Sequence, residues 1–137
     1  MKIHDKEFNW GARVYFEDTD SGGVVYHANY LKYMERARTE WLRSLDVDQH
    51  QLKNEKNIMF VVHRMNIKFR KPARFNDELL IRTKCIKVKS SSLILNQLIE
   101  CSNILLVEAE VEIACIDEVF FKPTLIPKKI KELMETL

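Results

Sequence analysis

The chain has 137 residues, of which 46% are apolar and 31% are charged, with only 3 Gly and 3 Pro. This composition is that of an ordinary folded protein and excludes the collagen-like, low-complexity and intrinsically disordered classes. The 22 Lys and Arg residues nearly balance the 20 Asp and Glu residues, giving a net charge of +2, which excludes proteins whose affinity comes mainly from binding a polyanion. We therefore expect one domain over residues 1–137 and no nucleic-acid partner.

The sequence predicts neither a membrane anchor nor an export signal. Its longest apolar run, residues 58–62, is far shorter than the roughly 18 to 20 residues that span a membrane. The first ten residues include several charged side chains and contain no apolar segment of the secretory type. The three cysteines, Cys85, Cys101 and Cys115, are odd in number and lack metal-ligand spacing. We expect a cytoplasmic protein with no membrane insertion, disulfide, cofactor or metal site.

The first predicted elements are a strand, an irregular loop and a long helix. Apolar residues alternate with polar ones over residues 8–16, which predicts a strand. Residues 17–29 break this alternation with acids and the Gly22-Gly23 pair, which favour a loop. Over residues 30–45 apolar side chains recur every three or four positions, which predicts an amphipathic helix of about four turns.

Strands dominate the rest of the chain. Residues 48–56 are polar and are expected to hold a short helix, and a further helix is expected over 128–137. Four strand-like segments lie between them, at residues 58–70, 78–88, 92–101 and 105–116. Turn residues separate these segments, and such short connections predict hairpins and an antiparallel meander.

This order of elements predicts an α+β fold with a five-stranded antiparallel sheet. Because long strands twist, the sheet is expected to curl around the one long central helix. A single helix leaves part of the apolar sheet surface and the sheet edges uncovered. We therefore expect a homo-oligomer that covers them.

The loop before the long helix has the residue types needed for catalysis. Asp20, the two glycines and His27 precede or begin the helix. A helix start presents unpaired backbone N–H groups and the positive end of the helix dipole, so it can stabilise an oxyanion. Glycines let a ligand approach the backbone closely. A carboxylate beside such an oxyanion site suits acyl transfer.

The string Asp-Thr-Asp-x-x-Gly-x-Val-x-His-x-x-Tyr, which begins at Asp18, resembles the 4-hydroxybenzoyl-CoA thioesterase family of hotdog-fold proteins. Within this family it is most similar to the bacterial acyl-CoA thioesterases associated with the Tol-Pal envelope system (YbgC type). Residues 60–62, 72–74 and 108–111 also resemble that branch. The resemblance implies a hotdog fold, sheet-to-sheet dimers paired into homotetramers, and metal-free hydrolysis of fatty and aromatic acyl-CoA thioesters in lipid metabolism.

The resemblance also assigns roles to individual residues. It implies that Asp20 is the catalytic carboxylate, acting as nucleophile or as general base, and that a backbone N–H at or next to His27 binds the oxyanion. The His27 imidazole is a second catalytic candidate, whereas Asp18 is expected to have a structural role through loop hydrogen bonds. The substrate-binding candidates are Gly22, Gly23, Val24 and Tyr26 in the loop, and Arg64, Lys89 and Ser91 as ligands of the CoA phosphates.

Several alternatives stay open from the residues alone. The cationic residues are also typical of a solvated surface, and the paired glycines of a plain turn. A non-catalytic acyl-carrier or envelope-complex adaptor would keep the same fold. An enoyl-thioester hydratase is a third function, although hydratase relatives space their pair as Asp-x4-His, whereas Asp20 and His27 have six residues between them. Acyl carrier protein, in place of CoA, is a further candidate for presenting the acyl group.

Overall fold

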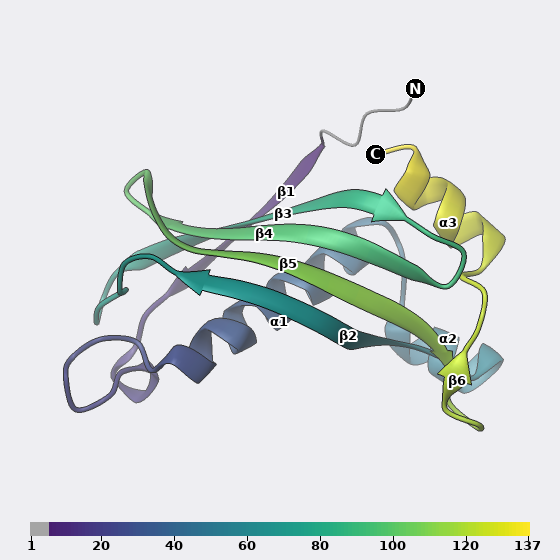
Figure 1. Ribbon diagram of the computed structural model, residues 1–137, viewed down its shortest axis with the longest axis horizontal. Helices are drawn as coiled ribbons and strands as arrows, with labels where there is room; N and C mark the ends of the chain where they lie inside the picture. The colour runs from purple at the N-terminus through teal and green to yellow at the C-terminus, as the bar shows by residue number, and fades with distance from the viewer. Residues whose placement is uncertain (1–5) are drawn as a thin grey trace.

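The computed structural model describes residues 6–137 and shows a curved sheet that lies over one long helix (Figure 1). Helix α1 (His27–Ser44) runs beneath the sheet, and α2 (Gln49–Lys56) and α3 (Lys128–Glu135) lie near the carboxyl end of α1. Residues 1–5, part of the amino-terminal segment on which the localisation prediction rests, lie outside the described residues.

The sheet contains the five predicted long strands. They are β1 (Glu7–Arg13), β2 (Ile58–Phe69), β3 (Glu78–Val88), β4 (Ser92–Cys101) and β5 (Ile104–Asp117). The two-residue strand β6 (Lys122–Pro123) pairs with β5 and makes the sheet six-stranded. A strand of this length, one residue of which is proline, leaves no alternating pattern, so the expected number of five was one too low. The α+β class and the curled sheet around one long helix are confirmed.

The strand order corrects the predicted meander. Strands β3, β4 and β5 follow one another as expected, but β2 pairs with β5, so the order is β1-β3-β4-β5-β2. Residues 70–77 therefore cross from one part of the sheet to another and do not form a tight hairpin. This connection instead hydrogen-bonds to the segment before α1: Val25 N donates to Ala73 O (2.8 Å), and Asn76 N donates to Val14 O (2.9 Å).

The core lies between α1 and the concave face of the sheet. Met34 and Ala37 of α1 and Leu95 and Val111 of the sheet are fully buried there. Alternate residues of each strand point to this face, as the period of two requires. The helix begins three residues earlier than predicted, because its first turn carries no apolar residue that continues the helical pattern.

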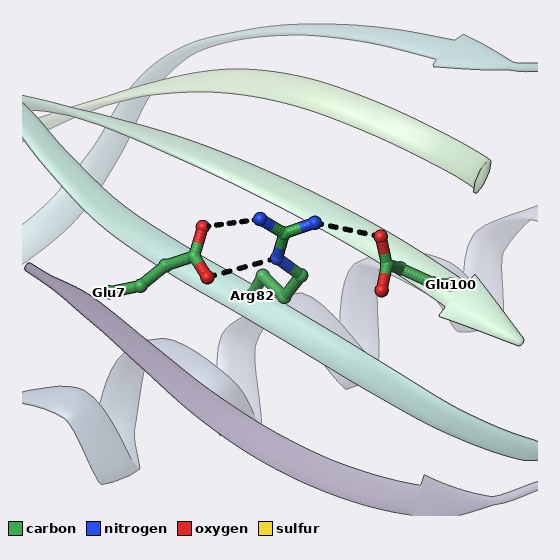
Figure 2. A network of polar contacts seen from close by, with 3 residues as sticks. All are labelled: Glu7, Arg82 and Glu100. Atoms are coloured by element: carbon green, nitrogen blue, oxygen red, sulfur yellow. Dashed lines mark hydrogen bonds and ion pairs between the residues drawn. The ribbon is translucent and has the colours of Figure 1, made fainter. Parts of the chain in front are cut away.

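A charged network on the other face connects three strands (Figure 2). Arg82 of β3 donates two hydrogen bonds to Glu7 of β1 (3.0 and 2.9 Å) and one to Glu100 of β4 (2.8 Å). These two carboxylates raise the pKa of Arg82. The network joins the edge strand β1 to the middle of the sheet.

All three cysteines are free thiols. Cys85 and Cys115 are buried, and Cys101 is half-buried. Burial raises the pKa of Cys85 and of Cys115 to about 11, which keeps both thiols protonated at neutral pH.

Over residues 6–137 no cluster of three or more His, Cys, Asp or Glu residues is arranged to hold a metal ion. In the same range, no helix combines the length and apolarity needed to cross a membrane.

Candidate active site

The loop before α1 folds back on itself as a small hairpin. Asp20 N donates to Val24 O (2.8 Å), Gly23 N donates to Asp20 O (3.1 Å), and Thr19 forms a bridge with Val25. Gly23 has a φ of 80°, a conformation that glycine adopts without steric cost. The turn therefore requires glycine at this position, and it holds Asp20 at its entry.

The carboxylate of Asp20 is exposed and carries only one local bond. Its Oδ1 accepts a hydrogen bond from the backbone N–H of Gly22 (2.8 Å), the Asx-turn arrangement that aspartate favours. Among residues 6–137 no cation forms an ion pair with it. The carboxylate is thus oriented by the turn while its charge stays unneutralised.

The start of α1 offers free backbone donors. Tyr26 is the N-cap residue, and no side chain of the described residues caps the helix. Tyr26 N donates to Asp18 O (2.9 Å), whereas the N–H groups of His27 and Ala28 have no acceptor within the described part of the chain. Such unpaired donors at the positive end of a helix are suited to bind an oxyanion.

Asp18 connects the loop to the helix. Its Oδ2 accepts from Tyr15 N (2.8 Å), and its backbone oxygen accepts from Asn29 Nδ2 (2.8 Å) as well as from Tyr26 N. These bonds agree with the structural role expected for Asp18. They fix the helix start relative to the hairpin that carries Asp20.

The connection between β2 and β3 supports the same helix start. The buried hydroxyl of Tyr30 accepts a hydrogen bond from Ala73 N (2.9 Å), and Ala73 O accepts from Val25 N. Burial raises the pKa of Tyr30, so this phenol stays neutral. Residues 70–77 thus hold both the loop and α1. The sequence does not reveal the bond between Tyr30 and Ala73, because no local pattern marks a hydrogen bond between residues so far apart in the chain.

The structure groups the six loop candidates at one end of α1. Asp20, Gly22, Gly23, Val24, Tyr26 and His27 all belong to the hairpin or to the first helical residue. The exposed His27 ring lies against Tyr26 (centroids 4.6 Å apart) and meets Phe69 edge-on (6.3 Å). Its imidazole forms no hydrogen bond with the described residues.

The three predicted phosphate ligands lie elsewhere. Glu112 of β5 accepts from Lys89 Nζ (3.0 Å) and pairs with Arg64 (3.3 Å), and Ser91 belongs to the turn between β3 and β4. In Figure 1 this turn lies at the opposite end of the sheet from the loop before α1. One chain therefore does not bring Arg64, Lys89 and Ser91 together with Asp20.

The sequence is similar to those of known thioesterases. The family model of the thioesterase superfamily matches residues 22–108, which include the glycines and the helix start but begin just after Asp20. The chain is 45% identical over 124 residues to the acyl-CoA thioester hydrolase YbgC of Escherichia coli O6:H1, covering 90% of this chain and 92% of that protein. It is 41% identical over 127 residues to the acyl-CoA thioesterase YbgC of Haemophilus influenzae, covering 93% of each chain.

Solved structures show the same fold. A probable thioesterase from Bartonella henselae superposes with a TM-score of 0.85 at 38% identity, covering 89% of this chain and all of that one. A mutant 4-hydroxybenzoyl-CoA thioesterase, in complex with 4-hydroxybenzoyl-CoA, superposes with a TM-score of 0.88 at 18% identity, covering 93% and 98% of the two chains. The second match supports the fold alone.

Proposed function

The chain belongs to the thioesterase superfamily and is an acyl-CoA thioester hydrolase, and we propose that Asp20 and the free N–H groups at the start of α1 carry out its reaction. The observation that carries this proposal is the pairing of an unneutralised carboxylate with unpaired backbone donors on one short segment. The thioester carbonyl oxygen binds at the N–H of His27 or Ala28. The carbonyl carbon then faces Asp20.

Asp20 acts by one of two routes. As a nucleophile, a carboxylate oxygen bonds to the carbonyl carbon, the C–S bond breaks, and water later opens the mixed anhydride. As a general base, Asp20 takes a proton from a water molecule whose oxygen attacks the same carbon, and the tetrahedral intermediate expels the thiolate. Either route consumes one water and yields a carboxylic acid and CoA thiol. Solvent oxygen-18 found in Asp20 after turnover would identify the nucleophilic route.

The helix start stabilises the charge that both routes create. Negative charge grows on the carbonyl oxygen as the carbon becomes tetrahedral, and fixed N–H donors bind this charge more strongly than the neutral carbonyl. Loss of one such donor typically costs about 10²-fold to 10³-fold in rate. The hydrogen bonds in which Asp18 and Tyr30 accept and Asn29 donates hold these donors in place.

A panel of purified thioesters tests the activity. Palmitoyl-CoA, benzoyl-CoA and a short acyl-CoA are incubated with the protein while a thiol reagent reports free CoA. Because Cys101 is half-buried, a blank without substrate corrects for its own reaction. We expect thiol release that disappears in Asp20→Asn. No release from any thioester would favour the adaptor, and loss of enoyl absorbance without release would favour the hydratase.

We propose that the active protein is a homo-oligomer built through its sheet, as a dimer that pairs into a tetramer. Strand β2 ends the sheet order and is twelve residues long, so one of its edges has free N–H and C=O groups. Val62 and Phe69 on this strand are about half exposed, at 47% and 50%. In such an assembly, Arg64, Lys89 and Ser91 of one subunit would serve the Asp20 of another by binding the CoA phosphates.

The remaining proposals concern the cellular setting. We propose a cytoplasmic location and a role in lipid metabolism, because the relatives named above are hydrolases of acyl-CoA thioesters. Acyl carrier protein is acidic in character, and Lys68, Lys87 and Lys89 offer cations to it. Comparing thiol release from acyl-CoA and from the matching acyl carrier protein thioester tests which carrier presents the substrate.

A further inference from the structure

A partly open cavity of about 150 Å³ lies beside the carboxyl-terminal half of α1, away from the hairpin that carries Asp20. Its walls are mainly apolar and include Trp41, Leu42, Phe60, Val62, Leu93 and Leu95. A space of roughly 150 Å³ has room for a molecule the size of benzene. The space therefore suits a ring or the last few carbons of a chain.

One polar wall of this cavity is formed by Arg38. Its Nη1 donates to Oε1 of Gln97 (3.0 Å), and Gln97 is fully buried, with its own Nε2 bound to Met34 O (3.1 Å) and Thr83 Oγ1 (2.9 Å). This buried network fixes the direction of the Arg38 side chain. The guanidinium is thus held at the cavity wall by a rigid partner.

Arg38 has spare hydrogen-bonding capacity and no ion-pair partner in the described part of the chain. A guanidinium has five N–H donors, and only one bond to a side-chain acceptor is formed within residues 6–137. Glu35, which also lines the cavity, accepts from Thr39 (3.4 Å) and lies farther than 4.0 Å from the Arg38 nitrogens. Removal from water lowers the pKa of Arg38, and Glu35 offsets this effect only in part.

The charge of Arg38 exceeds what its structural contact requires. A neutral donor would satisfy the single acceptor on Gln97, whereas a half-buried cation without a counter-ion is costly. An anionic oxygen that entered the cavity would supply the missing counter-ion and could bind two guanidinium nitrogens at once. The cavity walls would meanwhile cover the carbons next to that oxygen.

We propose that this cavity binds the distal end of the acyl group and that Arg38 selects acyl groups ending in a carboxylate. The preferred substrates are then CoA thioesters of dicarboxylic acids, compared with unsubstituted thioesters of the same length. This inference rests on the thioesterase function proposed above. Within one chain, the rise of an α-helix separates Arg38 from His27 by about 16 Å along the axis, so substrates of several lengths must be compared.

Matched substrate pairs test the selection. Decanoyl-CoA is compared with sebacoyl-CoA, dodecanoyl-CoA with dodecanedioyl-CoA, and palmitoyl-CoA with hexadecanedioyl-CoA, because the carboxylate must reach Arg38 from the start of α1. The quantity measured is the ratio of kcat/KM for the carboxylate-ended member to that for its partner. We expect a ratio above one for at least one pair, and a fall of about 10-fold to 100-fold in that ratio in Arg38→Gln, the range of a lost hydrogen bond to a charged group.

Two further variants separate selection from packing. Arg38→Lys keeps the charge and should retain part of the preference. Arg36→Gln removes a charge from an exposed position on the same helix and should leave the ratio unchanged. A purely structural role of Arg38 predicts that Arg38→Gln lowers both rates of a pair equally. An unchanged ratio in Arg38→Gln, or a wild-type ratio below one for every pair, would overturn the inference.

A binding measurement distinguishes this inference from the proposed function. Calorimetric titration of Asp20→Asn with each pair reports affinity without turnover, in the presence and absence of the Arg38→Gln change. Tighter binding of the carboxylate-ended member, lost in Arg38→Gln, would support selection even if the wild type released no thiol. Hydrolysis of every thioester with equal affinity within each pair would refute selection and leave the thioesterase function standing.

Discussion

Two carboxylates on this fold are held in contrasting ways. Asp20 is exposed, accepts one backbone hydrogen bond from Gly22 and has no cationic partner among residues 6–137. Glu112 accepts from Lys89 and from Ser92 (3.0 and 3.1 Å) and pairs with Arg64. The bonds from Lys89 and Ser92 lower the pKa of Glu112.

The difference indicates which acid is available for chemistry. A carboxylate whose charge is already matched by cations is a weak nucleophile and a weak base, because reaction must first break those bonds. Asp20 is oriented by a backbone donor and keeps its negative charge free to act. The same loop leaves N–H donors unpaired at the start of α1. Orientation without neutralisation is therefore the feature on which the proposed active site rests.

Replacing each acid by its amide gives the largest expected effect. Asp20→Asn should lower kcat for acyl-CoA hydrolysis by about 10²-fold to 10⁴-fold, since it removes the nucleophile or base. Glu112→Gln is the matched control and should keep kcat close to the wild-type value. Because Asp20 is exposed, the melting temperature of Asp20→Asn should be close to that of the wild type. Equal losses of kcat in the two variants would remove the contrast between the two acids.

The hydroxyl of Tyr30 provides the next largest effect. Tyr30→Phe removes the acceptor for the Ala73 N–H, and a buried donor left unsatisfied costs about 1 to 3 kcal/mol. Denaturant unfolding should show this decrease in the free energy of unfolding. Tyr26→Phe is the control, because Tyr26 is 48% exposed and its hydroxyl makes no hydrogen bond with the described residues. An unchanged stability of Tyr30→Phe would show that the contact with residues 70–77 is unimportant.

Replacing each of the two neighbouring glycines by alanine should affect a different property, activity for Gly22 and stability for Gly23. In Gly22→Ala the new Cβ would lie 3.2 Å from Asp20 Oδ1, so the carboxylate must move and kcat should fall about 10-fold, as expected for a misplaced reacting group. In Gly23→Ala nothing lies within 4 Å of the new Cβ, but φ is 80°, so stability should fall by about 1 kcal/mol. Kinetics and unfolding of both variants should show this reversal. If Gly22→Ala and Gly23→Ala changed kcat and stability alike, the activity of Asp20 would not depend on its contact with Gly22.

The smallest expected effect is on acid stability. The pKa values of Glu108 and Glu112 are lowered, mainly by Arg70 and Lys89 respectively. A lowered pKa in the folded state stabilises the protein above the unfolded value, near pH 4 to 5, and this stabilisation is lost as the pH falls through the folded pKa. Unfolding measured from pH 6 to pH 3 should therefore show a shallower decline for Glu112→Gln. Because the Arg70 and Lys89 side chains of these pairs are about half exposed, at 50% and 41%, the difference should be small.

Much of the fold could be predicted because its signals are local. Strands β3 and β4 have the predicted bounds, since turn residues flank alternating segments. The neighbours of β2 could not be predicted, because pairing with β5 depends on residues distant in sequence. The start of α1 was misplaced because its first turn, His27–Asn29, lacks the apolar periodicity that marks later turns.

The site shows the same division. Asp20, the glycines and His27 could be grouped because they lie within a few residues of one another. The pairing of Arg64 with Glu112 depends on strand register, and the bond between Tyr30 and Ala73 depends on a connection whose path the sequence does not reveal. Arg38 was not singled out, because its significance comes from the buried Gln97 on a distant strand.

The most direct test is the structure of Asp20→Asn with an intact acyl-CoA bound. The account predicts that the thioester oxygen lies about 2.7 to 3.1 Å from the backbone nitrogen of His27 or Ala28. It also predicts that the carbonyl carbon lies within about 3.5 Å of the side chain at position 20. A thioester bound away from the start of α1, in a variant that had lost activity, would contradict the central claim.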